Sequence, residues 1–236
     1  MRLCRFLASS FLVACFASGQ QPLQQFRNRN GTFHIDLPAG WRQIAPNEAR
    51  TIQENGNAPA RLGLAQPHHF YAVGPVDAWL AGDFSGPWLY LVEGASEWYL
   101  SDDYAQDLTT MWAAEAAASG ERHEVTNIQR AKVGTQAVEV IMATRLNTPV
   151  GSRPAVQCLD VHSPAGGRQV TFSFSCDPQH FAAHEPTFRS WLQTLTFARL
   201  PRGQASLGDR LWGPIVTSVA VGLILLLLYK HSRSRR

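Results

Sequence analysis

The residues best suited to metal chemistry are Asp177, His180 and His184. His180 and His184 are four residues apart and would share one face of a helix. Imidazole nitrogen and carboxylate oxygen together suit zinc, but a further ligand is not evident in the sequence. Two interpretations therefore stand. The set is either a metal site, as in a metal-binding protein or a metal-dependent hydrolase, or, as we favour, surface polar residues around a helix start with Phe181 packed inward.

Two cysteines, Cys158 and Cys176, flank a predicted hairpin around residues 164–167. In an oxidising compartment such a pair is a candidate for one disulfide. An even-sum strand register would put both side chains on one face, whereas the odd-sum register of a two-residue loop would put them on opposite faces. The alternative is a pair of small buried apolar side chains, and the sequence leaves both open.

Other catalytic patterns are incomplete in this sequence. The segment 94–98, Gly-Ala-Ser-Glu-Trp, resembles a nucleophile elbow but lacks the second glycine that lets the strand turn sharply. The sequence contains neither a glycine-rich phosphate loop nor a Cys-x-x-Cys pair. We therefore expect a protein that is not an enzyme and has no cofactor.

The ends of the chain predict how the protein is positioned. Residues 212–229 form an uncharged apolar run, which at about 1.5 Å of helix rise per residue nearly matches a bilayer core of roughly 30 Å. The basic residues in 230–236 predict that this tail stays cytoplasmic. Residues 1–19 have the layout of a signal peptide, so the intervening region would be exported, to the periplasmic side of the inner membrane. Cleavage before Cys15, with a lipid on that cysteine, is a less favoured alternative.

Charge excludes one class of partner. The chain has 21 basic and 18 acidic residues, and two of the bases lie in the signal and four in the tail. The exported part thus keeps 15 bases against all 18 acids, a net charge of −3. A nucleic-acid-binding surface would need a basic patch, which the interspersed charges do not provide.

Hydropathy patterns predict one exported domain. Alternating or short apolar runs indicate strands, and apolar residues at helical spacing indicate helices after Ser101 and around Trp191. Runs of adjacent strands with helices set apart predict an α+β domain with a mainly antiparallel sheet. The strands are expected at 32–37, 61–65, 69–73, 88–92, 125–130, 137–144, 155–162 and 169–176. The expected organisation is a signal peptide at 1–19, a polar leader without its own structure at 20–31, the domain at 32–197, a linker at 198–211, a transmembrane helix at 212–229 and a basic tail at 230–236.

Two stretches resemble the PsbP-like superfamily. Residues 32–41, an alternating strand running into Pro-Ala-Gly-Trp, look like its opening strand, and residues 170–197 are similar to its closing strand, helix and last short strand. The resemblance implies an antiparallel sheet with helices on both faces, and it implies no catalytic residue. Members include extrinsic accessory subunits of photosystem II, proteins that bind partner proteins and exported bacterial proteins. We therefore expect a single-pass, membrane-anchored binding or accessory protein. Its partner and oligomeric state are not specified by the sequence.

Overall fold

The computed structural model describes residues 22–59, 62, 70–97, 100–101, 103–165 and 168–200. The predicted signal peptide with Cys15, the membrane helix at 212–229 and the tail lie outside these residues. Among the residues described, no helix has the length and apolar character needed to cross a bilayer.

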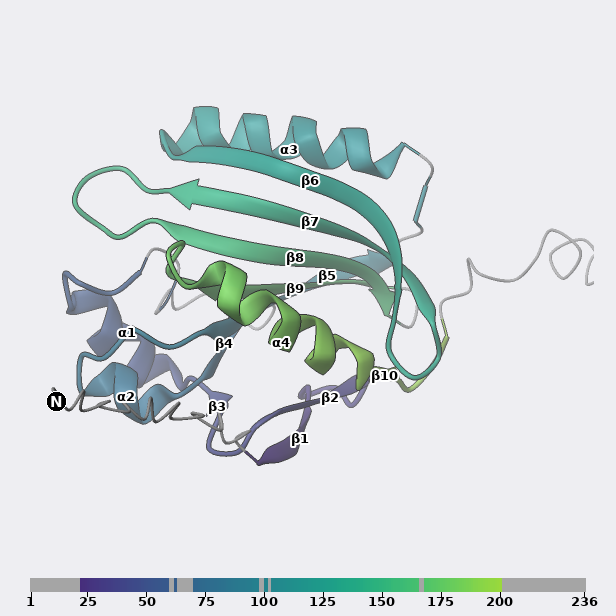
Figure 1. Ribbon diagram of the computed structural model, residues 1–236, viewed down its shortest axis with the longest axis horizontal. Coiled ribbons are helices and arrows are strands. Elements are labelled where there is room, and N and C mark those ends of the chain that lie inside the picture. The colour runs from purple at the N-terminus through teal and green to yellow at the C-terminus, as the bar shows by residue number, and fades with distance from the viewer. Residues whose placement is uncertain are drawn as a thin grey trace, which may run out of the picture.

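Two antiparallel sheets form the framework of the domain (Figure 1). The larger sheet has seven strands in the order β3-β4-β5-β9-β8-β7-β6, and the smaller has the order β1-β2-β10. The strands are β1 (Leu23–Arg27), β2 (Phe33–Pro38), β3 (Arg42–Gln43), β4 (Phe70–Gly74), β5 (Trp88–Glu97), β6 (Arg122–Val133), β7 (Val138–Thr148), β8 (Val156–Ala165), β9 (Arg168–Cys176) and β10 (Thr196–Phe197). The helices are α1 (Pro46–Glu54), α2 (Val76–Leu80), α3 (Tyr104–Ser119) and α4 (Phe181–Gln193).

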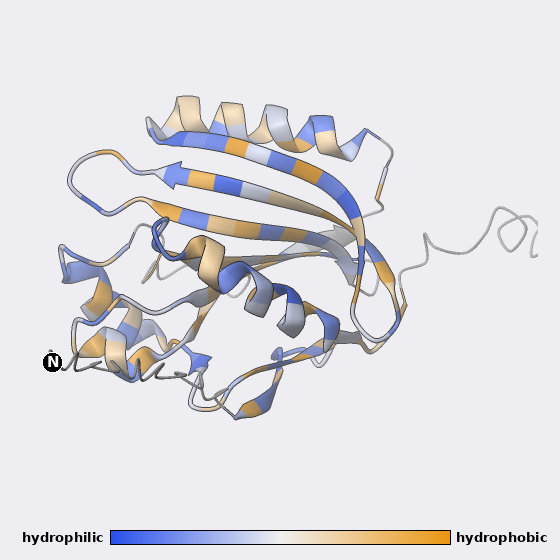
Figure 2. Cartoon of the chain, in the orientation of Figure 1, coloured by the Kyte–Doolittle hydropathy of each residue, from blue (hydrophilic) through white to orange (hydrophobic). Residues whose placement is uncertain are grey.

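Helices cover both faces of the large sheet, as the resemblance to the PsbP-like superfamily implied. Helix α4 crosses one face together with the small sheet, and α3 lies over the other face beside β6, with α1 and α2 near β4 (Figure 1). The period-2 hydropathy of the strands is visible as alternating colours along β6, β7 and β8 (Figure 2). The main core lies under α4, where the Phe33 and Phe172 rings pack edge to face at 4.9 Å and Phe174 stacks on Phe188 at 5.4 Å.

One local expectation was wrong. The leader at 20–31 was expected to have no structure, yet β1 pairs with β2 along its whole length. Its side chains are mostly exposed, so main-chain hydrogen bonds hold it in place. The nine-residue helix α1 lies between β3 and β4, and the five-residue helix α2 lies between β4 and β5. Helix α4 begins at Phe181 and contains Pro186 in its interior.

The turn between β6 and β7 holds the end of the domain. Gly134 has a φ of +74°, and the next residue, Thr135, donates its main-chain N–H to the Leu195 carbonyl at 2.9 Å. Gln136 donates from Nε2 to the Phe197 carbonyl at 2.9 Å and accepts from the Phe197 N–H at 2.8 Å. These bonds fix β10, the last strand before the predicted membrane linker.

Replacing Gly134 with alanine is expected to lower the free energy of unfolding by about 2 kcal/mol or more, because a left-handed backbone already costs a side chain about 1–2 kcal/mol. A Cβ at this position would also collide with the Leu195 carbonyl oxygen. Gly151 is the matched control, since its φ is +88° and a Cβ there meets nothing within 4 Å. Urea unfolding of the full chain in detergent should show the larger loss for Gly134→Ala. Equal losses in the two variants would contradict the proposed contact.

Candidate functional site

A buried polar stripe runs across the face of the large sheet that is turned away from α4. The strand register places Arg145 opposite Cys158, Cys158 opposite Ser175, and Ser175 opposite Trp88. The adjacent cross-strand row on the same face brings together Asp160, Ser173 and Tyr90. Alternation sends the intervening side chains of β8 and β9 into the core under α4. Polar groups from four strands are thereby collected on one face.

An ion pair anchors this stripe. Arg145 Nε lies 2.7 Å from Asp160 Oδ2, and both side chains are almost fully enclosed, with 4% and 1% of their surface exposed. Ser173 donates its hydroxyl to Asp160 Oδ1 at 2.5 Å, and the Arg145 guanidinium lies over the Trp112 ring at 5.3 Å. Asp160 therefore holds the Arg145 guanidinium along one edge, and the Trp112 ring packs on its face.

The two charges stabilise each other against the cost of burial. Burial alone would raise the pKa of Asp160, but the adjacent Arg145 holds that pKa below its usual value. Burial alone would lower the pKa of Arg145, but Asp160 raises it above its usual value. Both groups are thus charged at neutral pH, and the pair as a whole is neutral.

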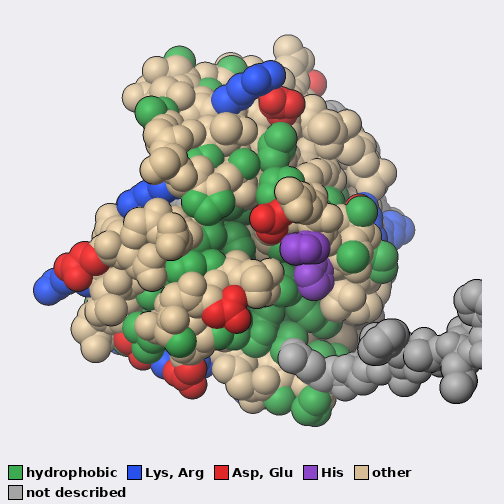
Figure 3. Space-filling model, turned by 60° about the vertical axis from the view of Figure 1, so that its left-hand side comes forward, with side chains coloured by type: hydrophobic (Ala, Val, Ile, Leu, Met, Phe, Trp, Pro, Cys, Tyr) green, Lys and Arg blue, Asp and Glu red, His purple; other side chains and the backbone are tan. Residues whose placement is uncertain are grey.

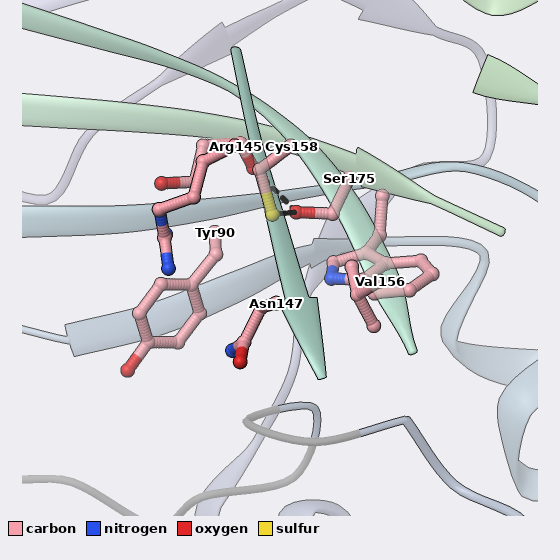
Figure 4. Close-up of a pocket in the computed structure, with 8 residues that line it drawn as sticks. Tyr90, Arg145, Asn147, Val156, Cys158 and Ser175 are labelled. Carbon is pink, nitrogen blue, oxygen red and sulfur yellow. Dashed lines mark hydrogen bonds between the residues drawn. The ribbon is translucent and has the colours of Figure 1, made fainter. Parts of the chain in front are cut away.

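A pocket opens beside this ion pair. It is small and partly open to solvent, and it is lined by Trp88, Tyr90, Arg145, Asn147, Val156, Cys158, Ser173 and Ser175. Figure 4 shows the ends of the Arg145 and Asn147 side chains lying beside the Tyr90 ring. Cys158 Sγ and Ser175 Oγ are 3.4 Å apart on the opposite side of this group.

Two polar atoms of the pocket lining lack a partner. Arg145 Nη1 and Asn147 Oδ1 are both buried and have no hydrogen-bond partner among the described residues. Each residue is only 3% exposed. A buried polar group left without a partner costs about 1–3 kcal/mol, so these two atoms are available to a water molecule or to a ligand.

A second group of polar residues continues the stripe beneath α3. His162 Nδ1 lies 3.2 Å from the Tyr104 hydroxyl and 3.2 Å from Thr171 Oγ1, and Gln169 Nε2 lies 3.3 Å away. The Trp112 ring, 5.9 Å from the imidazole, covers the same histidine. Burial lowers the pKa of His162 to about 4, so its ring is neutral at physiological pH.

The predicted metal ligands do not form a ligand set. Asp177 accepts the N–H of Gln179 through Oδ1 at 2.7 Å, His180 occupies the N-cap position of α4, and His184 stacks on the Phe188 ring at 6.0 Å. Burial lowers the pKa of His184, and nearby His180 adds to this effect. In the described part of the chain, no three His, Cys, Asp or Glu side chains are arranged to hold a metal ion.

The candidate disulfide does not form in this structure. Cys158 and Cys176 are both free and buried. The observed register pairs Cys158 with Ser175 and Gln157 with Cys176, which is the odd-sum arrangement. Cys158 consequently lines the polar pocket, whereas Cys176 faces the core under α4, where burial raises the pKa of its thiol to about 12.

The polar pocket was not predicted from the sequence. The signal that was present is the alternation of β9, in which Thr171, Ser173 and Ser175 interleave with apolar residues. Alternation of this kind usually marks a strand with one solvated face. Here the polar face is covered, because α3 and the α1–α2 region pack over it.

The architecture defines an α+β domain with an antiparallel sheet covered by helices on both faces. Among solved structures, the chain is similar to cyanobacterial PsbP (CyanoP) from Synechocystis sp. PCC 6803, with 13% identity, a TM-score of 0.51, and coverage of 79% of this chain and 98% of that one. The fold is therefore PsbP-like, as the resemblance of the two ends predicted.

Two further similarities are weaker. A protein of unknown function from Pseudomonas aeruginosa, PA94, has a TM-score of 0.35 at 10% identity, covering 76% of this chain and 97% of that one. The Ran-binding protein Mog1p from Saccharomyces cerevisiae has a TM-score of 0.40 at 10% identity, covering 71% and 84%. No protein-family model and no curated protein matches the sequence.

Proposed function

We propose that the protein is a non-enzymatic binding or accessory module, displayed on the periplasmic side of the cytoplasmic membrane and held there by a helix at residues 212–229. The observation that carries the proposal is a PsbP-like domain whose buried pocket presents an unpartnered donor and an unpartnered acceptor. Such groups are suited to hold a ligand, and the polar side chains around them are already engaged with one another.

The surface offers additional support for a partner. Figure 3 shows apolar side chains gathered in a hollow of the face that is reached by turning the left-hand side of Figure 1 forward, with acidic side chains nearby. Apolar patches with polar surroundings are typical of interaction surfaces. The short linker at 198–211 would keep this domain close to membrane-embedded partners.

Affinity capture from detergent-solubilised membranes tests the binding role. The full chain, tagged at its cytoplasmic end, is expected to retain a partner in a fixed ratio. The control is an unrelated exported domain fused to residues 198–236, which retains the anchor and should not capture that partner. Capture of the same proteins by the control, or turnover of a substrate by the purified full chain, would contradict the proposal.

Protease treatment of intact spheroplasts tests the topology. The domain should become accessible to added protease while the C-terminal tag stays protected until the membrane is opened. A protected domain with an accessible tag would show that the arrangement is inverted.

A further inference from the structure

The polar atoms of the pocket beside Arg145 indicate the chemistry of its ligand. This inference rests on the proposed binding role. Its two unsatisfied atoms differ in kind, because Arg145 Nη1 can only donate a hydrogen bond and Asn147 Oδ1 can only accept one. The two residues are two positions apart on β7, so their side chains leave the same face of the strand. A complementary ligand must both accept and donate a hydrogen bond.

The charge of the pocket restricts the ligand further. Arg145 already interacts with the Asp160 carboxylate at 2.7 Å, and Glu115 of α3 is a second acid that acts on it electrostatically. Among the described residues that line the pocket, Arg145 is the only cation, and Asp160 already neutralises it. Burying an added anion there is unfavourable in a medium of low polarity. A cation would be repelled by the positively charged Arg145 guanidinium. The pocket is therefore suited to a neutral group.

We infer that this pocket binds the carboxamide end of an asparagine or glutamine side chain from a protein partner. The carboxamide oxygen accepts from Arg145 Nη1 and the carboxamide nitrogen donates to Asn147 Oδ1. A side-chain end can enter a small pocket walled by four strands, whereas a main-chain peptide group would have to bring its flanking residues with it.

The site is built before the ligand arrives. Asp160 holds the guanidinium along one edge while the Trp112 ring packs on its face at 5.3 Å. Ser173 holds Asp160 in turn through a bond of 2.5 Å. Little side-chain freedom is lost when the ligand binds, so even a small carboxamide should show saturable binding.

The test uses acetamide as the probe, on the full chain in detergent micelles with ¹⁵N-labelled arginine and asparagine side chains. Acetamide is expected to shift the Arg145 and Asn147 side-chain resonances in a saturable manner. N,N-dimethylacetamide keeps the acceptor but has no N–H, so it should bind about tenfold more weakly, the ratio expected for one hydrogen bond. Acetate, the anion of the same shape, should also bind more weakly.

The matched variants are Asn147→Leu and Asn127→Leu. Asn147→Leu removes the acceptor while filling the space with an apolar group, and it should abolish the preference for acetamide over N,N-dimethylacetamide. Asn127, exposed on β6, is the control whose replacement should leave the preference intact. The probe series on the unmodified chain decides the question even if the Asn147 variant unfolds.

Three results would overturn the assignment: no saturable shift with acetamide, acetate binding as tightly as acetamide, or N-methylacetamide binding as tightly as acetamide, which would indicate a peptide group. The partner capture separates this inference from the proposed function. A partner retained equally by the unmodified chain and by Asn147→Leu would leave the binding role in place and exclude this pocket as its site.

Discussion

Replacing Asp160 with asparagine is expected to lower the free energy of unfolding by about 3–5 kcal/mol, the loss typical of removing one partner from a buried ion pair. Arg145 would then carry an uncompensated charge in a site where it is almost completely enclosed. The substitution preserves the shape of the side chain, so the effect reports charge and not packing. Urea unfolding of the full chain in detergent at neutral pH measures the loss.

An exposed ion pair is the matched control for this prediction. Arg130 and Glu139 approach to 2.7 Å across β6 and β7, but their side chains are 37% and 39% exposed. Glu139→Gln should therefore cost less than about 1 kcal/mol. Losses of similar size for Asp160→Asn and Glu139→Gln would contradict the importance of burial.

A double variant separates the stability of the pair from its role in the pocket. Removing both charges with Arg145→Met and Asp160→Leu should recover most of the stability lost in Asp160→Asn, because no buried charge remains. The same double variant should lose the acetamide site, since the donor at Arg145 is gone. A double variant as unstable as Asp160→Asn would show that the surrounding packing, rather than the unpaired charge, determines the loss.

The longer sheet elements were predictable because side-chain pattern alone defines them. Strands β2, β7, β8 and β9 and helix α3 have clear hydrophobic periods, and each was expected close to its observed position. These elements also gave the fold class correctly. The two ends of the domain resemble the PsbP-like superfamily in sequence. The solved cyanobacterial PsbP structure supports this resemblance at the level of the fold.

The elements that were missed depend on tertiary contacts. Strand β1 is held by main-chain bonds to β2, and Leu23 at its start is 51% exposed, so its side chains give little signal. Helix α2 is only five residues long, and its Trp79 is buried against Gly74. Short elements of this kind are marginal by themselves and form because the folded domain supplies their partners.

The pocket was not predictable for a related reason. Single-strand alternation shows that Ser173 and Ser175 share a face with each other, but not whether that face meets water or another layer. The pocket that they line also requires Arg145 from β7, which the strand register brings to Cys158 across the sheet. Register is fixed by the paired strands together, so this constellation exists only in the folded sheet.

Acidification from pH 6.5 to about 4 is expected to weaken the fold through His162. Burial depresses the pKa of this histidine from 6.5 to about 4, so the unfolded chain binds the proton more readily in that interval. The stability that comes from the neutral ring is present above pH 6.5 and is lost as the pH falls toward 4. The interval corresponds to about 3 kcal/mol, because each tenfold change in proton affinity is about 1.4 kcal/mol.

The groups around His162 keep this effect distinct from other titrations. Asp160 on the same strand favours the charged ring and Arg145 opposes it, while Tyr104 from α3 and Thr171 from β9 contact Nδ1. The pKa of Asp160 is held below its usual 3.8, with Arg145 opposing the effect of burial, so loss of its contribution begins at lower pH than the His162 interval. The losses of stability due to His162 and to Asp160 should therefore occur in different pH ranges.

Unfolding measured at several pH values in His162→Asn tests this assignment. Asparagine can place its Oδ1 near the position of Nδ1 and cannot titrate. The free energy of unfolding of His162→Asn should therefore depend less steeply on pH between 6.5 and 4. His34→Asn on β2, remote from the buried polar stripe, should keep the slope of the unmodified chain. If His162→Asn retained the full slope, the acid sensitivity in that interval would have to arise from other groups, and the buried neutral imidazole would not be its source.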